Sequence, residues 1–214
     1  MADVGTDHGF LPIRLLQQGR IASAVATDIR PGPLSRAEAN RAAAEINGDV
    51  MRCILCDGLE AVSQTDVDTV VIAGMGGENI AEILHRAPWT RFNTRLILQP
   101  MTRPEVLRQA LYESGMRIIS ERLVYDSGRI YAIFCAEAGQ AEPLSSAELY
   151  TGRYALISKE ELFPRYLREW KEKIDTALSG LSKSHRTEDA ERLEHLRLVR
   201  REMTEMEERY ADSL

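Results

Sequence analysis

Short apolar runs alternate with helical patterns from Met1 to about Glu137. The runs predict strands at Met1–Val4, Ala22–Thr27, Val50–Cys56, Thr69–Ala73 and Arg95–Gln99. The stretches between them repeat apolar residues every three or four positions and predict helices at Leu11–Gln18, Pro33–Ile46, Glu78–His85 and Pro104–Ser114. Strands that alternate with helices in this way form a parallel sheet with helices on both faces.

The pattern changes after the fifth predicted strand. Arg117–Tyr125 and Arg129–Glu137 are both β-rich and are joined by Asp126-Ser127-Gly128, so they predict an antiparallel hairpin. Five crossover-linked strands followed by an antiparallel pair match the seven-stranded α/β sheet of class I (Rossmann-like) S-adenosylmethionine-dependent methyltransferases. A nicotinamide dehydrogenase has a parallel sixth strand instead, so the pattern disfavours that class.

The last part of the chain has a purely helical pattern. Residues 140–158 predict a connector, and Ser158-Lys159-Glu160-Glu161 predicts a capping box, as Thr102-Arg103-Pro104-Glu105 does earlier. Two apolar stripes then follow at helical spacing: Phe163, Leu167, Trp170, Ile174, Ala177 and Leu181, and later Leu193, Leu196, Val199, Met203, Met206 and Tyr210.

With a turn near Gly180, the two stripes predict an antiparallel coiled-coil hairpin. We therefore expect two domains, a Rossmann-like methyltransferase domain at 1–157 and a helical coiled-coil domain at 158–214.

Composition narrows the class of protein further. The chain has 214 residues, 44% of them hydrophobic, which is enough for one full-sized domain and a smaller appendage. No apolar run reaches the roughly 20 residues that span a bilayer, and no secretory signal begins the chain, so the sequence predicts a cytoplasmic protein without a membrane partner. The net charge of −6 argues against broad nucleic-acid binding but allows a local basic face.

The loop after the first predicted strand is the first candidate for chemistry. Its residues, Asp3-Val4-Gly5-Thr6-Asp7-His8-Gly9, resemble a glycine-rich nucleotide loop without completing that motif. The Asp7 carboxylate would repel a pyrophosphate, whereas it suits a cofactor that carries an ammonium and a sulfonium group. The alternative is that Asp7 only caps the next helix. His8 stands without other metal-ligand residues nearby, so we expect a neighbour of the loop or cofactor and no metal.

Two further carboxylates follow predicted strands. Asp28 ends the second strand, where Rossmann-like folds place the acid that accepts both ribose hydroxyls. Asp57 follows the third strand, where class I methyltransferases place an acid that binds the adenine amino group. The alternative for Asp57 is a turn residue before Gly58. Together with the first loop, these carboxylates predict an adenosyl cofactor.

The fourth and fifth strands also end in unusual residues. Gly74-Met75-Gly76-Gly77 contains three glycines and would leave backbone open to a ligand, although a plain glycine turn is the alternative. The Asn/Asp-Pro-Pro-aromatic motif of many amino-methylating nucleic-acid enzymes is absent here. Gln99 ends the fifth strand, where it either contacts a base edge or caps the strand.

These residues resemble one family over nearly the whole chain. DVGTDHGFLPI, CDGL, IAGMGG and LILQP, together with the terminal helical hairpin, are similar to the bacterial tRNA (adenine(22)-N(1))-methyltransferases, the TrmK family. The resemblance implies methyl transfer from S-adenosyl-L-methionine to N(1) of adenine 22 in tRNA. Its implied cofactor site comprises Gly5, Asp7, His8, Asp28, Ile29, Asp57, Gly58, Gly74, Met75 and Gly76.

The chain departs from the family pattern at two places. Members usually have a helical segment before the first strand, so we expect that such a segment is missing ahead of Met1. Members also usually have Asn where this chain has Met101, which removes a polar contact to the target base.

The resemblance also suggests roles in catalysis and tRNA binding. Asp7 and Gln99 become the candidate catalytic residues, with Asp7 accepting a hydrogen bond from the exocyclic amine of adenine. The base would turn out of its stack into the crevice at Gly74–Gly77. The helical hairpin would grip tRNA phosphates, and its candidate residues are Lys171, Lys173, Arg197, Arg200 and Arg201. The alternative is a solvated coiled coil with intrahelical ion pairs.

Two other functions stay open at this point. One is a methyltransferase of the same fold that acts on another RNA or a small molecule and uses the hairpin for dimerisation. The other is a non-catalytic protein that binds S-adenosylmethionine or tRNA. The sequence does not fix the oligomeric state, and a monomer is slightly favoured.

Overall fold

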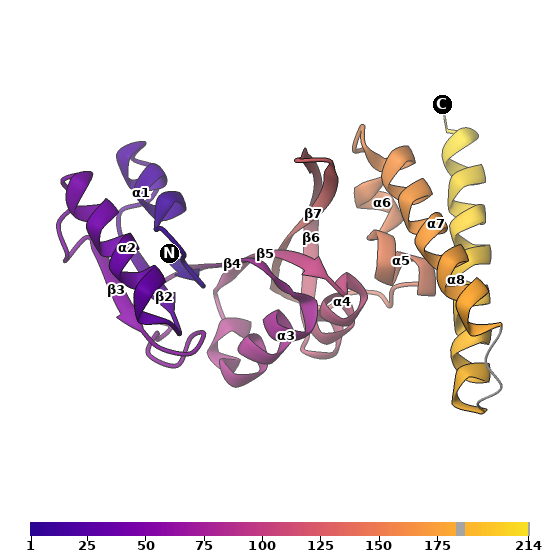
Figure 1. Ribbon diagram of the computed structural model, residues 1–214, viewed down its shortest axis with the longest axis horizontal. Coiled ribbons are helices and arrows are strands. Elements are labelled where there is room, and N and C mark those ends of the chain that lie inside the picture. The colour runs from indigo at the N-terminus through magenta and orange to yellow at the C-terminus, as the bar shows by residue number, and fades with distance from the viewer. Residues whose placement is uncertain (183–186, 214) are drawn as a thin grey trace. The chain divides into compact units, whose positions relative to one another are not determined.

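The computed structural model describes residues 1–182 and 187–213 (Figure 1). By its internal contacts the chain forms two compact units, which we describe separately. Unit 1 comprises residues 1–119 and 133–141, and unit 2 comprises residues 120–132 and 142–214. Unit 2 therefore contains the helical region predicted at 158–214 together with the preceding residues and the tip of the β-hairpin. The proposed division into independent domains at residue 158 stays a prediction.

A seven-stranded sheet in the order β3-β2-β1-β4-β5-β7-β6 forms the centre of the fold. The strands are β1 (Ala2–Val4), β2 (Ala24–Asp28), β3 (Met51–Leu55), β4 (Thr69–Gly76), β5 (Arg95–Thr102), β6 (Met116–Asp126) and β7 (Arg129–Ala138). The strands β1 to β5 pair in parallel, and β7 pairs with β5 antiparallel. This topology confirms the predicted class I methyltransferase fold.

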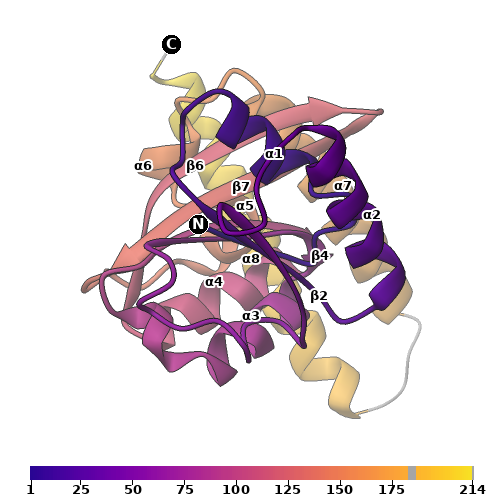
Figure 2. The ribbon, with the colours of Figure 1, turned by 90° about the vertical axis from the view of Figure 1, so that its left-hand side faces the viewer.

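Helices cover both faces of the sheet in unit 1. They are α1 (Phe10–Gln17), α2 (Pro31–Ala43), α3 (Gly77–Arg86) and α4 (Pro104–Glu113), with a short 3₁₀ helix at Pro88–Arg91. Figure 2 shows α1 and α2 on one face of the sheet and α3 and α4 on the other. Right-handed crossovers require this arrangement, because the strand order runs in opposite directions from β1 and from β4. The strand β2, which lies between β3 and β1, is buried at every residue, so packing on both faces fixes its position.

Both predicted capping boxes are wrong, although Pro104 does begin a helix. Arg103 is the N-cap of α4 in a left-handed conformation with φ 54°, and its Nε donates to Glu105 Oε1 at 2.5 Å. The box at Ser158 is absent because α7 begins at Phe163 with Leu162 as its N-cap, and Glu160 next to it accepts hydrogen bonds from Leu123 N and from Arg122. The chain does contain a capping box between Ser145 and Glu148, where the connector was expected.

Unit 2 is more helical than the sequence indicates. Its helices are α5 (Ser146–Thr151), α6 (Tyr154–Ile157), α7 (Phe163–Leu181) and α8 (Thr187–Ala211), so the expected connector contains two short helices. The predicted stripes are the buried faces of α7 and α8, which lie side by side (Figure 1). Both also pack against α5.

The predicted turn near Gly180 agrees with the end of α7, which ends at Leu181 with Ser182 as its C-cap. Residues 183–186 lie outside the described residues. Among the residues that are described, no helix is long and apolar enough to cross a membrane.

Candidate functional site

The loop after β1 bends sharply toward the end of β2. Gly5 has φ 75°, which favours glycine, and the backbone amides of Gly5 and Thr6 both donate to Thr27 O at 2.8 and 2.9 Å. Gly9 is the N-cap of α1, again with positive φ, and within the described chain no side chain caps this helix. Asp7 is therefore not a helix cap, and the helix-capping alternative for this residue is wrong.

Asp7 instead faces two basic side chains. Its Oδ1 accepts a hydrogen bond from Arg36 at 2.5 Å, and its Oδ2 lies 3.3 Å from His8 Nε2. The hydrogen bond from Arg36 holds the pKa of Asp7 below its usual value. Asp7 thus remains an ionised, largely exposed carboxylate on the surface of unit 1.

A cavity of about 490 Å³ opens at the carboxyl ends of the parallel strands, where α/β sheets usually bind ligands. Seven of the predicted cofactor residues line it: Gly5, Asp28, Ile29, Asp57, Gly58, Gly74 and Met75. Asp7, His8, Gly76 and Gln99 are not among the lining residues. The structure therefore brings most of the predicted site together and leaves the two candidate catalytic residues outside the cavity wall.

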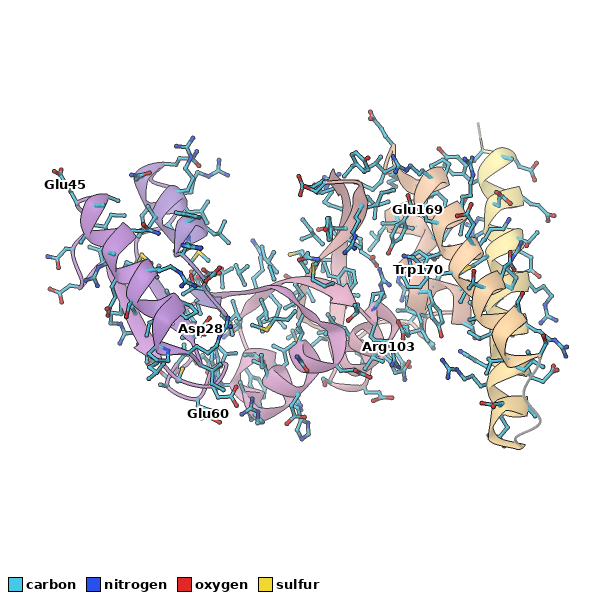
Figure 3. All side chains as sticks on the ribbon, viewed as in Figure 1. Asp28, Glu45, Glu60, Arg103, Glu169 and Trp170 are labelled. Atoms are coloured by element: carbon cyan, nitrogen blue, oxygen red, sulfur yellow. The ribbon has the colours of Figure 1, made fainter. Side chains whose placement is uncertain are left out.

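Asp28 is the buried acid of this cavity, with only 6% of its side chain exposed (Figure 3). It is the last residue of β2, and its Oδ1 accepts a hydrogen bond from Arg30 N at 2.8 Å. That bond fixes the carboxylate against the strand end. A carboxylate held in this way is suited to accept hydrogen bonds from ribose hydroxyls.

Asp57 follows β3, the strand that pairs with β2, and belongs to an ion-pair network. Arg86 Nη1, near the C-terminal end of α3, donates to Asp57 Oδ2 at 2.9 Å and to Glu60 Oε1 at 2.8 Å. Arg86 also pairs with Glu82 on its own helix. The hydrogen bond from Arg86 lowers the pKa of Asp57, so this exposed carboxylate stays ionised.

Gly74, near the end of β4, and Gly77, the first residue of α3, have different structural roles. Gly74 lines the cavity with φ 77°, and a Cβ there would meet no atom within 4 Å. A Cβ on Gly77, by contrast, would lie 2.2 Å from Arg103 O. Gly74 therefore leaves backbone open to a ligand, whereas Gly77 permits the close packing of α3 against the end of β5.

Gln99 holds the glycine loop in place. Its Oε1 accepts a hydrogen bond from Gly74 N at 2.9 Å, and its Nε2 donates to Pro100 O at 3.2 Å. The same amide lies 3.7 Å from the sulfur of Met101. Gln99 is thus a residue that positions Gly74.

Helix α3 contributes cavity residues that were not predicted from the sequence. Four of its residues line the cavity: Asn79, Glu82, Ile83 and Arg86. Their spacing of three, one and three positions puts them on one helical face, and this pattern would have identified them. Arg30, which follows β2, was also missed.

The charges on the cavity wall fit a cationic cofactor. Among the described residues that line it are three carboxylates, on Asp28, Asp57 and Glu82, and two guanidinium groups, on Arg30 and Arg86. The excess of negative charge would oppose a pyrophosphate and would favour a ligand with ammonium and sulfonium groups. The volume is also within the range of small-molecule sites.

In unit 2, the five predicted tRNA-binding side chains all have protein partners. Lys171 pairs with Glu207 and Arg200 with Asp175 at 2.8 Å, so these two connect α7 and α8. The other three interact within their own helix: Lys173 lies over the ring of Trp170 (labelled in Figure 3), Arg197 pairs with Glu194, and Arg201 pairs with Glu205.

Comparison with known proteins agrees with this architecture. Residues 1–202 match the family model "TrmK: tRNA (adenine(22)-N(1))-methyltransferase". The curated tRNA (adenine(22)-N(1))-methyltransferase of Bacillus subtilis is 29% identical over 197 residues, which is 89% of this chain and 81% of the relative.

Solved structures give the same result. The crystal structure of B. subtilis TrmK has a TM-score of 0.83 at 26% identity and covers 97% of this chain and 91% of its own. The Streptococcus pneumoniae protein Sp1610, solved in complex with S-adenosyl-L-methionine, has a TM-score of 0.76 at 34% identity and covers 93% and 91%. From the matched family model and this fold, the chain belongs to the tRNA (adenine(22)-N(1))-methyltransferase family.

Proposed function

We propose that this chain transfers a methyl group from S-adenosyl-L-methionine to N(1) of adenine 22 in tRNA, through the cavity at the carboxyl ends of β1 to β4. The observation that carries the proposal is the cavity itself, in which Asp28 and Asp57 stand at the ends of successive strands. Family membership supplies the substrate and the acceptor atom. It also favours action in the cytoplasm with tRNA as the partner.

The residues present fit the cofactor. Asp28 would accept hydrogen bonds from the ribose hydroxyls, and Asp57 from the adenine amino group. Gly74 allows close approach of its backbone because the space that a Cβ would occupy is open, whereas at Gly5 that space holds the Met75 side chain. When bound, S-adenosylmethionine supplies a methyl group on a positively charged sulfur. The remaining work of the protein is to orient the acceptor and exclude water.

We further propose that Asp7 assists the acceptor base. Adenine N(1) has an in-plane lone pair, so methylation requires no prior removal of a proton. A carboxylate that accepts a hydrogen bond from the exocyclic amine would make N(1) more nucleophilic and offset the charge of the product. Arg36 supports this role because its hydrogen bond lowers the pKa of Asp7 and keeps it ionised. Gln99 acts indirectly, through the position of Gly74.

For tRNA binding, the structure divides the five helical candidates. Lys171 and Arg200 brace α7 against α8, so we assign them a mainly structural role. Lys173, Arg197 and Arg201 are exposed, and their interactions with described residues lie within their own helices. Such surface contacts are weak and can be exchanged for phosphate contacts. We propose these three as the phosphate-binding side chains of the helical unit.

The function is tested by methyl transfer from tritiated S-adenosylmethionine to an unmodified tRNA transcript with adenine at position 22. The matched control is the same transcript with guanine at that position. We expect about one methyl group per adenine-22 transcript and none on the control. Equal labelling of both transcripts, or transfer only to small acceptors, would contradict the proposal. Cofactor binding without any transfer would favour a non-catalytic protein.

A further inference from the structure

Exposed apolar side chains gather at the carboxyl ends of β1 and β2. Among the described residues, the two most exposed large hydrophobic residues are Phe10 at 65% and Ile29 at 64%. Phe10 begins α1 directly after the β1 loop, and Ile29 follows β2, the parallel neighbour of β1. Leu11 is also exposed. Single exposed apolar residues are common, but these are concentrated at one sheet edge, and Ile29 lines the cofactor cavity.

The ring of Phe10 is already part of a parallel stack. Its centroid lies 5.0 Å from that of His8, and the two planes differ by only 6°. With 65% of Phe10 exposed, much of its ring is open to solvent. Stacked aromatic side chains with an open face are the usual platform for unpaired nucleic-acid bases.

Two arginine side chains lie close to this stack. His8 lies 3.3 Å from the Asp7 carboxylate, which Arg36 holds at 2.5 Å. Arg30 lies 3.7 Å from the carboxylate of Asp28, and the Arg30 side chain is 72% exposed. Because an exposed ion pair at this distance is weak, Arg30 can exchange it for a phosphate next to a stacked base.

We propose that Phe10 is the stacking platform for an unpaired tRNA base at the entrance of the active site, and that Arg30 contacts an adjacent phosphate. We call this surface the stacking ledge and define it by His8, Phe10, Leu11, Ile29, Arg30 and Arg36. The proposal rests on the proposed function, because it takes tRNA as the substrate. Phe10 acts as a positioning residue that places the acceptor strand beside the cavity.

The test compares the wild type with Phe10→Leu, Phe10→Trp and Phe92→Leu. Phe92 is the matched control because it is 62% exposed but precedes β5, at the amino ends of the strands. We expect Phe10→Leu to raise the KM and Kd for tRNA about tenfold, as loss of one base stack does. Phe10→Trp should retain tRNA affinity, and Phe92→Leu should match the wild type. Calorimetric affinity for S-adenosylmethionine should be unchanged in all three.

The possible outcomes distinguish a failure of the stacking-ledge proposal from a failure of the proposed function. If the wild type methylates tRNA and Phe10→Leu has the same KM and Kd, the stacking ledge is refuted. If Phe10→Leu weakens cofactor and tRNA binding equally, Phe10 supports the cofactor loop and the ledge is also refuted. A wild type that does not methylate tRNA would instead refute the proposed function.

A second variant tests the phosphate contact. Arg30→Gln should lower the slope of log Kd against log salt by about one, while Phe10→Leu leaves that slope unchanged. An unchanged slope in Arg30→Gln would remove Arg30 from the ledge.

Discussion

The strand ends of unit 1 and the helix pair of unit 2 carry charge in different ways. At the strand ends, irregular backbone around Gly5 and Gly74 leaves carboxylates such as Asp28 on the wall of a cavity. In the helix pair, regular backbone places each candidate cation beside a carboxylate or an aromatic ring, as in Arg200 with Asp175. Charged residues in a motif therefore point to a site more reliably where the backbone is irregular than where it is helical.

The two regions also differ in how firmly their charged side chains are held. Asp28 accepts a backbone hydrogen bond and is buried, so its orientation is fixed before any ligand binds. The pairs on α7 and α8 are partly exposed and each is worth at most about 1 kcal/mol. The carboxylate of Asp28 thus has a fixed orientation at a strand end, whereas the charges of the helix pair lie in partly exposed ion pairs.

The largest effect is expected from Gly77→Ala. The new Cβ would lie 2.2 Å from Arg103 O, and backbone must move to accommodate it. We expect a loss of about 3 kcal/mol in the free energy of unfolding, measured by urea denaturation. Gly74→Ala is the matched control: it has open space, so only its positive φ of 77° opposes Ala, at about 1–2 kcal/mol. Equal stability of the two variants would contradict the separate roles of these glycines.

Next in size is the effect of Asp28→Asn on cofactor binding. The amide keeps the shape of the side chain but loses the charge that strengthens hydrogen bonds to ribose. We expect the affinity for S-adenosylmethionine, measured by calorimetry, to fall about 10- to 100-fold. Circular dichroism would check that the variant is folded. An unchanged affinity would show that the cavity does not hold the ribose at Asp28.

The helix pair should divide into two kinds of cation. Lys171→Gln and Arg200→Gln remove pairs between α7 and α8, so each should lower stability by less than about 1 kcal/mol. Lys173→Gln and Arg201→Gln should leave stability unchanged and reduce the salt dependence of tRNA binding by about one per lost phosphate contact. If all four variants change the salt dependence equally, the division is wrong.

The smallest effect concerns the titration of Asp57. The hydrogen bond from Arg86 lowers the pKa of Asp57, so the carboxylate stays ionised to a lower pH than usual. In Arg86→Gln this pKa should rise toward the ordinary value of about 3.9, and protonation should begin at higher pH. NMR titration of the Asp57 carboxyl carbon would measure the change. An unaltered titration would mean that Arg86 does not control this carboxylate.

Much of the fold could be predicted from the sequence because strand and helix periods are local properties. The positions of Asp28 and Asp57 on the cavity wall could also be predicted, since the carboxyl ends of neighbouring parallel strands lie at one edge of the sheet. Arg86 could not be placed in the same way, because its role depends on the direction in which α3 packs. The sequence does contain part of the evidence for this face of α3, because Asn79, Glu82 and Ile83 have helical spacing and all line the cavity.

Other features depend on tertiary contacts that no local pattern specifies. The pairing of Lys171 with Glu207 requires the register between α7 and α8. The bond from Arg36 to Asp7 joins residues 29 positions apart, so the sequence around Asp7 does not indicate this partner. The capping box predicted at Ser158 is wrong because α7 begins at Phe163, with Leu162 as its N-cap.

Methylation of tRNA by the cavity at the strand ends is tested most directly by mass spectrometry of nucleosides from unmodified tRNA after incubation with this protein and S-adenosylmethionine. We expect 1-methyladenosine that maps to position 22 and is absent when that adenine is replaced by guanine. A methylated nucleoside at another position, or unmodified tRNA in the presence of bound cofactor, would contradict it.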